Sequence, residues 1–334
     1  MAKVLMITRA IEDPQSNSFQ RGAYDRLKKS VELGFSRHQL VEDAKEADII
    51  LFPKMHVMFG NHIRREAVYK VFPDKCFAFG IDDEPVPMVP GVYASLRKDW
   101  YLPKRTRAGF FLSSMENPYV DFNPAAVERD LLYSFVGSTN TWPTRVSLAK
   151  LNHPRGFFLD TSKESLPILS TGSDEQRSAF WKRYADIIRR SKFVLCPRGL
   201  GTSSIRLFEA MKMGRAPVIL ADQWVSPSGP QWEEFSIRIP EGDILDVPQI
   251  LEKREEEAVA LGQKARQEWE RWFAPEVIFN TVVDWCLEIK ATRRLPEFLS
   301  RLTVYPQVFL RPVIFRAYLR SWKMRITKAN ELQE

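Results

Sequence analysis

The sequence lacks the features of secreted, membrane-spanning and disulfide-bonded chains. Its three cysteines, Cys76, Cys196 and Cys286, are odd in number and far apart, which supports neither a disulfide framework nor a CxxC metal site. The first apolar run meets a charge after about six residues, too few for a signal peptide, and no run approaches the roughly 18 residues of a membrane span. We therefore expect a cytoplasmic protein with reduced, buried cysteines.

The sequence also lacks low-complexity tracts and internal repeats. With 44% hydrophobic and 27% charged residues, it is typical of a folded globular protein. Its 334 residues suit two domains of about 150 residues each.

The net positive charge of the chain is carried by its C-terminal end. The formal net charge is +7, and residues 290–334 contain ten Lys or Arg and three Glu, which account for all of it. A neutral body with a basic end argues against a nucleic-acid-binding core and favours an anionic surface as partner of the tail.

Short apolar runs alternate with helical patterns along both halves. In the first half the runs are "VLMIT", "ADIILFP" and "KCFAFGID"; from Leu131 the rhythm restarts with "LLYSFVGS", "RGFFLDTS", "KFVLCP" and "APVIL". Such runs, separated by helices, are typical of parallel sheets covered on both faces. We predict an α/β fold with two facing Rossmann-like domains and C-terminal helices. The expected boundaries are 1–125 for the first domain, 126–290 for the second and 291–334 for a basic, aromatic helical tail.

Two helices are predicted in the last part of the second domain, before the tail. The stretch "DVPQILEKREEEAVALGQKARQEWERWF" carries charges at i, i+4 spacing and favours a solvated helix, and "PEVIFNTVVDWCLEIK" favours a second helix with Pro near its start.

The segment 191–220, "SKFVLCPRGLGTSSIRLFEAMKMGRAPVIL", indicates a phosphate site. Its "RGLGTSS" turn brings two glycines and several amides to a helix N-terminus at the carboxyl edge of a strand. Arg198 and Arg206 add charge-assisted donors for a diphosphate, and Glu209 could accept from ribose hydroxyls. The segment has neither GxxxxGK[ST] order nor GxGxxG spacing, which argues against P-loop and dinucleotide sites. A glycine turn and a surface Arg206–Glu209 pair without function remain the alternative.

The same segment resembles the signature of the exostosin-like glycosyltransferases, family 47. In that family a CPRG turn, an R-x-x-E-A-M helix and a G-x-x-P-V-I strand recur in this order. Upstream, "LLYSFVGSTNTWPTR" resembles the F-x-G-S...R segment that opens the family's second domain. The resemblance covers residues 131–240 and implies the GT-B architecture and an inverting transferase.

By this resemblance the second domain holds a nucleotide-sugar donor. The predicted donor-binding residues are Gly137, Ser138, Arg145, Arg198, Gly199, Gly201, Thr202, Ser203, Ser204, Arg206 and Glu209. The chain departs from the family where Arg215-Ala216 replaces a frequent Cys-Ile. We expect Arg215 to interact with the helix C-terminus rather than with a ligand.

An inverting transfer also needs a proton acceptor on the first domain. "FAFGIDDEPVP" brings Asp82, Asp83 and Glu84 just past the carboxyl end of a strand, and its distant similarity to the acidic loop of GT-B fucosyltransferases points to Asp83. An ordinary solvated loop is the alternative. Asp13, His56 and His62 are competing bases. The cationic turn makes a metal less necessary, so we predict metal-independent chemistry without a cofactor.

The tail "LSRLTVYPQVFLRPVIFRAYLRSWKMRITK" interleaves cations with apolar side chains. It could lie at an anionic membrane surface, close the fold against the first domain, or do both.

The function expected from these residues is transfer of a sugar from a nucleoside diphosphate to a saccharide acceptor, such as a lipid-linked or cell-surface glycan. A fucosyltransferase-like enzyme using a guanine nucleotide sugar, and a silent nucleotide- or glycan-binding synthase subunit, are the alternatives. We expect a cytoplasmic enzyme, peripheral at the inner face of the membrane.

Overall fold

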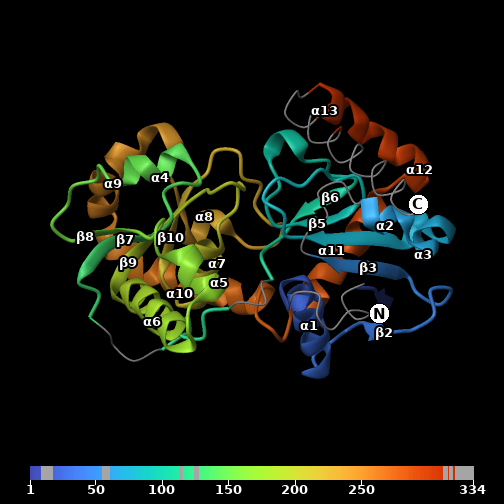
Figure 1. The fold of residues 1–334 in the computed structure, drawn as a ribbon, viewed down its shortest axis with the longest axis horizontal. Helices are drawn as coiled ribbons and strands as arrows, with labels where there is room; N and C mark the ends of the chain where they lie inside the picture. The colour runs from blue at the N-terminus through green and yellow to red at the C-terminus, as the bar shows by residue number, and fades with distance from the viewer. Residues whose placement is uncertain are drawn as a thin grey trace.

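Two parallel sheets, each covered by helices, lie side by side in the computed structural model of the chain (Figure 1). The structure describes residues 1–8, 18–54, 61–112, 116–123, 128–310, 315 and 319. The predicted α/β fold class with two Rossmann-like domains, the GT-B arrangement, is confirmed.

The first sheet has the order β2-β1-β3-β4-β5-β6. Its strands are β1 (Lys3–Met6), β2 (Gln39–Leu40), β3 (Ile49–Lys54), β4 (Cys76–Gly80), β5 (Gly91–Tyr93) and β6 (Thr106–Ala108). Alternate residues of a strand face opposite sides, so each face needs its own helices. Phe77 and Phe79 join one core cluster with residues of α1 (Ser18–Glu32) and α11 (Ile278–Thr292). Cys76 and Ala78 join another with residues of α2 (Asn61–Arg65) and α3 (Ala67–Val71).

The second sheet has the order β11-β10-β9-β7-β8. Its strands are β7 (Leu131–Gly137), β8 (Gly156–Asp160), β9 (Ser191–Pro197), β10 (Ala216–Leu220) and β11 (Ile237–Arg238). The connecting helices are α4 (Pro143–Leu148), α5 (Ser165–Thr171), α6 (Asp174–Arg190), α7 (Ile205–Lys212) and α8 (Trp232–Phe235). Val194 and Cys196 of β9 pack with α6 and α7, whereas Phe193 and Leu195 pack with α9 (Val247–Lys253) on the other face.

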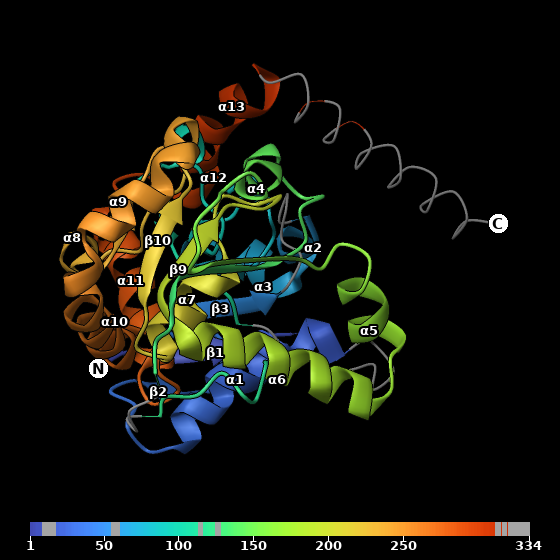
Figure 2. The ribbon, with the colours of Figure 1, turned by 90° about the vertical axis from the view of Figure 1, so that its left-hand side faces the viewer.

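The solvated helix predicted after Asp246 is wrong in two respects. The chain forms α9 and α10 (Ala258–Trp272), with a 3-10 turn at Glu255–Glu257 between them. Helix α10 buries Leu261, Ala265 and Trp269, and it packs against α7. The charged residues of α10 lie on its solvent-facing side. Their i, i+4 spacing in the sequence therefore predicted a solvated helix and did not reveal the buried side. Figure 2 shows α9 and α10 along one side of the second sheet, away from α5 and α6.

Helix α11 returns the chain to the first domain. It packs against α1, β3, β5 and β6, and it buries Trp285, Cys286 and Ile289 there. The predicted second domain, 126–290, included this helix. The domain boundaries remain a prediction, but α11 packs with the first sheet because its apolar face covers that sheet. The chain then ends in α12 (Glu297–Ser300) and α13 (Tyr305–Phe309), followed by residues that are largely outside the described ranges.

One apolar core spans both domains. Phe110, in the segment that links the sheets, contacts Phe79 of the first sheet, Phe208 of α7 and Trp285 of α11. Its ring centroid lies 5.1 Å from that of Phe273, which precedes the crossing to α11. The two sheets therefore share a hydrophobic interior and do not meet only at a polar cleft.

Hydrogen bonds also join the domains at the carboxyl ends of the sheets. The Lys98 amide donates to the Gln223 carbonyl over 2.9 Å, and the Val225 amide donates to the Leu96 carbonyl over 3.2 Å. The Thr202 hydroxyl donates to the same Leu96 carbonyl over 3.1 Å. These contacts bring the loop after β5 against the turn after β9 and the loop after β10.

The cysteines behave as predicted, since all three are free and buried. In the part of the chain that the structure describes, no helix is both long enough and apolar enough to cross a bilayer.

Candidate donor site

A pocket opens where the turn after β9 meets the first domain. Its cavity volume is about 280 Å³. The lining residues are Asp83, Phe111, Thr141, Arg145, Tyr184, Gly199, Leu200, Ser203, Ser204, Ile205, Arg206 and Glu209. Six of the predicted donor-binding residues and the predicted base are therefore brought together at one edge of the second sheet.

The turn before α7 needs glycine because other groups approach it closely. A Cβ on Gly201 would lie 2.4 Å from the Ser95 hydroxyl and 2.8 Å from the Asp83 carbonyl, both on the first domain. A Cβ on Gly199 would lie 3.0 Å from Nη2 of Arg145. Ser204 is the N-cap residue of α7, and its side chain makes no capping bond. The turn thus brings a helix N-terminus into the pocket, where its amides favour an anion.

Two guanidinium groups face this pocket, one buried (Arg206) and one partly buried (Arg145), and neither has a carboxylate partner among the described residues. Arg206 is 8% exposed, stacks 4.6 Å above the Phe135 ring and donates through Nη2 to the Val136 carbonyl. Arg145 donates to the Arg198 carbonyl over 2.7 Å and to the Ser138 carbonyl over 3.0 Å. Burial, followed by repulsion from Arg206, lowers the pKa of Arg145 to about 9, so it remains charged at neutral pH.

Within the described ranges neither guanidinium forms an ion pair. Buried charges are normally paired, because leaving one unpaired costs several kcal/mol, at roughly 3–5. Carbonyl oxygens satisfy part of the hydrogen bonding of Arg145 and Arg206 but supply no countercharge. The site therefore fits a negatively charged ligand.

Three polar atoms around the pocket are buried and lack a hydrogen-bond partner among the described residues. They are the Thr141 hydroxyl, the Ser203 hydroxyl and Nε of Arg206. Buried polar atoms without partners are rare in folded proteins and often mark the place of a ligand or a water molecule. Their position beside two unpaired cations is consistent with phosphate oxygens as acceptors.

A carboxylate lies at the other end of the pocket. Tyr184 of α6 donates from its hydroxyl to Oε2 of Glu209. Burial raises the pKa of Glu209, while the Tyr184 hydrogen bond and the charges of Arg206 and Lys212 act in the opposite direction. A carboxylate held in this way can accept hydrogen bonds from ligand hydroxyl groups.

Of the three acidic residues after β4, only Asp83 lines the pocket. Asp82 is buried at 6% exposure, and Glu84 lies 3.6 Å from Nη1 of Arg97. The charge of Asp83 also acts on Arg145 across the domain boundary. Among the competing bases, Asp13 and His56 are outside the described residues. His62 lies on α2 and does not line the pocket.

The remaining predicted donor-binding residues do not line the pocket. A Cβ on Gly137 would be 2.4 Å from Nη2 of Arg206, so this glycine makes room for that side chain. Ser138 holds Arg145 through its carbonyl, and Thr202 joins the domains. Arg198 is 2% exposed, stacks 3.6 Å from the centre of the Trp142 ring and donates to the Leu200 carbonyl over 3.1 Å. Binding of the nucleotide-sugar donor by Arg198 remains a prediction. In the structure its contacts with Trp142 and Leu200 hold the turn after β9 in shape.

Sequence reasoning missed Thr141, Tyr184 and Phe111. Thr141 stands four residues before Arg145 and could have been found through that motif. Tyr184 lies 25 positions from Glu209 on another helix, and Phe111 belongs to the link between domains. Neither has a local sequence signal.

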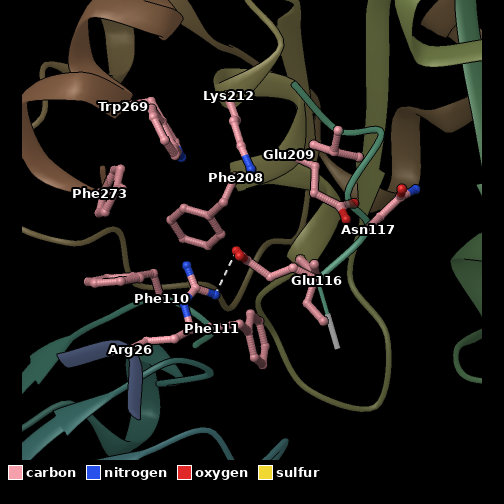
Figure 3. Close-up of a pocket in the computed structure, with 12 residues that line it drawn as sticks. Arg26, Phe110, Phe111, Glu116, Asn117, Phe208, Glu209, Lys212, Trp269 and Phe273 are labelled. Carbon is pink, nitrogen blue, oxygen red and sulfur yellow. Dashed lines mark ion pairs between the residues drawn. The ribbon is translucent and has the colours of Figure 1, made fainter. Parts of the chain in front are cut away.

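A second pocket lies on the far side of Glu209 and shares Phe111, Ile205 and Glu209 with the first. Figure 3 shows Arg26 of α1 and Glu116 pointing toward one another, and their side chains approach within 2.6 Å. Phe110, Phe208, Trp269 and Phe273 surround it and belong to the shared core. This pocket lies at the interface between the two domains, where their packing is incomplete.

Comparison with known proteins identifies the segment that contains the candidate donor site. Residues 105–254 match the family model of the Exostosin GT47 domain. The chain contains an exostosin GT47 domain. This domain runs from β6 through the whole second sheet into α9, beyond the 131–240 segment that the motifs indicated.

The relatives of the GT47 domain include much longer proteins. Over 168 residues the chain is 32% identical to Exostosin-1 of Drosophila melanogaster, covering 47% of this chain and 21% of that protein. Over 135 residues it is 33% identical to a probable glucuronoxylan glucuronosyltransferase of Arabidopsis thaliana, covering 39% of this chain and 28% of that protein. The chain therefore spans less than a third of the length of these relatives.

Solved structures similar to the chain are distant. Anabaena HepE in complex with UDP-glucose has a TM-score of 0.46 and 10% identity, covering 86% of this chain and 100% of that one. WaaG, a glycosyltransferase involved in lipopolysaccharide biosynthesis, has a TM-score of 0.41 and 11% identity, covering 84% of this chain and 99% of that one. Because the TM-scores are below 0.5 and the sequence identities are about 10%, these structures provide no argument about the chemistry of the GT47 domain.

Proposed function

We propose that this protein is a glycosyltransferase that uses a nucleoside diphosphate sugar as donor and a saccharide as acceptor. The observation that carries the proposal is the pair of guanidinium groups of Arg206, which is buried, and Arg145, which is partly buried; they face one pocket and form no ion pair with a described carboxylate. A diphosphate supplies the missing negative charge, and its oxygens can accept from the unbonded Thr141 and Ser203 hydroxyls. The GT47 domain, which contains this pocket's second-domain side, supports the same conclusion.

In the proposed reaction an acceptor hydroxyl attacks the anomeric carbon of the donor from the face opposite the diphosphate. A new carbon–oxygen bond forms as the bond to the diphosphate oxygen breaks, which inverts the configuration. Asp83 takes the proton of the attacking hydroxyl. Arg145, Arg206 and the N-terminal amides of α7 stabilise the charge on the departing diphosphate. Glu209 accepts hydrogen bonds from ribose hydroxyls.

Asp83 is proposed as base because it reaches the pocket from the domain opposite the cations. A base next to Arg145 and Arg206 would lie on the leaving-group side, where it could not assist attack from the opposite face. The Asp83 carbonyl also lies against Gly201, so its loop is held at a fixed distance from the turn. Such fixed placement favours transfer of a proton in a defined geometry.

Removing the two unbonded hydroxyls tests the donor site. Thr141→Val and Ser203→Ala delete groups that have no hydrogen-bond partner in the described structure, so neither should lower the free energy of unfolding. Each should weaken binding of a nucleoside diphosphate by about 5- to 10-fold, as loss of one hydrogen bond does. Calorimetry with UDP and GDP and chemical denaturation measure the two quantities.

Thr144→Val is the matched control. The Thr144 hydroxyl donates to Oε2 of Glu241 over 2.6 Å and does not line the pocket, so its loss should reduce stability and leave affinity unchanged. If Thr141→Val and Ser203→Ala bind both nucleotides as the natural protein does, the proposed donor site is wrong. A preference for GDP over UDP would favour the fucosyltransferase-like alternative.

Asp83→Asn tests the reaction itself. We expect turnover to fall by about 100-fold or more, with nucleotide affinity nearly unchanged, in an assay of nucleotide release across a panel of donors and saccharides. Glu84→Gln, which alters the neighbouring carboxyl group paired with Arg97, should retain turnover. Activity that survives chelation of divalent ions is expected from the predicted metal-independent mechanism. Donor binding without turnover for every acceptor would favour the silent synthase subunit.

A further inference from the structure

The C-terminal segment 295–310 is amphipathic in the reverse of the usual sense. Its polar residues Glu297 and Ser300 are buried at 0% and 8% exposure, whereas its large apolar residues point outward. Glu297, Ser300 and Val304 are spaced i, i+3 and i+7, so they share one face of the helical turns α12, Arg301–Val304 and α13. The segment therefore packs by its polar face, and six of its large apolar side chains are exposed.

The inward face is tied firmly to the first domain. Nη1 and Nη2 of Arg105 each lie 2.9 Å from an oxygen of Glu297, and Nη1 also donates to the Ser300 hydroxyl over 2.6 Å. Tyr69 donates to Glu297 over 3.3 Å, and Val304 joins the core beside Tyr93. Figure 1 shows α12 and α13 over the first domain near β5 and β6. These bonds fix which side of the segment faces outward.

The outward face carries six exposed large apolar side chains. Its members are Leu295, Phe298, Leu299, Leu302, Phe309 and Leu310, exposed by 52%, 59%, 39%, 55%, 56% and 81%. Leu295 lies just before α12, and Phe298 and Leu302 are spaced i, i+4 across α12 and the following 3-10 turn, so they share one side of the segment. Single exposed apolar residues are ordinary, but a group of this kind on one segment marks a binding surface.

An exposed cation borders this face, and the sequence beyond it is rich in cations. Arg294 is exposed beside Leu295. In sequence, residues 290–334 contain ten Lys or Arg and three Glu, with Tyr, Phe and Trp between them. Charged residues are depleted at the centre of protein–protein interfaces, whereas apolar side chains flanked by Lys and Arg are typical of helices at anionic bilayers.

We propose that the outward face of segment 295–310 binds the interfacial region of an anionic lipid bilayer. The apolar side chains enter the boundary between headgroups and acyl chains, and the flanking cations contact the headgroups. Because Arg105 holds the segment to the first sheet, the bound protein has one orientation toward the bilayer. This surface lies outside the donor pocket, so the proposal is independent of the proposed reaction.

Vesicle sedimentation tests the proposal with the full chain. Wild-type protein should sediment with vesicles of phosphatidylcholine containing about one third phosphatidylserine, and much less with phosphatidylcholine alone. Phe298→Ser/Leu302→Ser should bind the anionic vesicles at least about 10-fold more weakly, because two exposed side chains no longer enter the interface. Rising salt should weaken wild-type binding further.

Val71→Ser/Leu166→Ser is the matched control, since these side chains are 65% and 74% exposed on α3 and α5. It should bind vesicles like the wild type. If Phe298→Ser/Leu302→Ser unfolds, Leu310→Gln replaces it, because Leu310 is the most exposed member of the face. Absence of wild-type binding, or equal binding by all variants, overturns the proposal. A dimer in solution that the face variants dissociate, without vesicle binding, assigns the surface to a second copy of the chain and likewise overturns it.

Discussion

At the scale of single residues, Glu209 occupies an unfavourable position that function can explain. Burial raises its pKa, and Tyr184 offsets that effect only in part. A carboxyl group whose folded pKa exceeds its unfolded pKa destabilises the fold as pH rises through that interval. A residue kept at such a cost is a candidate for ligand contact.

Glu209→Gln should therefore stabilise the fold and weaken nucleotide binding. The amide can still accept from Tyr184 but carries no charge to desolvate. The gain in the free energy of unfolding over wild type should be larger at pH 8 than near pH 4.5, the ordinary carboxyl range. Denaturation at both pH values measures this, and calorimetry should show affinity for a nucleoside diphosphate reduced by about 10- to 100-fold. Glu257→Gln, in an exposed pair with Arg254, should change neither quantity by much.

Gly137→Ala should displace Arg206 without unfolding the protein. The added Cβ would lie 2.4 Å from Nη2, at the end of a flexible side chain, so Arg206 can move away. We expect at least about 10-fold weaker nucleotide binding, the loss that a charge-assisted contact brings, with a small change in melting temperature. Gly242→Ala, where a Cβ meets nothing within 4 Å, is the control. Unchanged affinity in Gly137→Ala would show that Arg206 is not a ligand contact.

Residues near one another in sequence were the predictable part of the site. The turn Arg198–Ser204 and the helix after it carry their geometry locally, and the expected contact of Arg215 with the end of α7 is present, since Nη1 donates to the Met213 carbonyl over 3.0 Å. The place of Tyr184 in the pocket depends on Glu209 of another helix, and the stacking of Arg198 depends on Trp142, which is distant in sequence. Such contacts have no periodic signal in sequence.

At the scale of elements, buried and exposed ion pairs of equal length differ in what they contribute. Arg105–Glu297 and Arg107–Glu288 both have nitrogen–oxygen distances of 2.9 Å. Arg105 and Glu297 are 2% and 0% exposed, whereas Glu288 is 51% exposed. Removing one partner of a buried pair leaves an uncompensated charge in the interior, but water solvates the remaining partner of an exposed pair.

Glu297→Ala should thus lower the free energy of unfolding by about 3–5 kcal/mol, and Glu288→Ala by about 1 kcal/mol or less. Urea denaturation of both variants gives the comparison. Equal losses would show that Arg105 finds another partner when Glu297 is absent. The pair spans 192 positions, which is why the sequence indicated a basic tail but not how it is attached.

Helix α10 illustrates the same limit. Its charges at i, i+4 spacing predicted a solvated helix, yet Leu261, Ala265 and Trp269 form a buried stripe against α7. Strands β3, β4, β7, β9 and β10 were predictable because short apolar runs bounded by turns have few alternatives. The two-residue strands β2 and β11 were not, because they carry too few residues for a pattern.

At the scale of the whole molecule, the GT47 match and the folding unit do not coincide. The match ends at residue 254, before α10 and α11. Helix α10 covers β9, β10 and α7, and Phe110 packs on Phe273 and Trp285. A fragment of residues 105–254 would expose this shared core to water.

We expect residues 105–254 expressed alone to be insoluble or to lack a cooperative unfolding transition. The full chain should unfold in one transition monitored by both tryptophan fluorescence and circular dichroism, because one core serves both sheets. A soluble 105–254 fragment that unfolds cooperatively and binds nucleotide would contradict this expectation.

The meeting of Phe110 with Phe273 also limits how the two domains can move. Among the described residues the chain passes between the domains after Phe110 and again after Phe273, and the rings of these two residues are in contact. Translation of one domain along the other would stretch both passages, whereas rotation about a point near the rings would stretch neither. Opening of the donor pocket should therefore follow a rotation of one domain about this point, which breaks the hydrogen bonds between Thr202 and Leu96 and between Lys98 and Gln223. A ligand that contacts both Asp83 and Arg206 would connect the two domains across the pocket and hold them in the closed arrangement.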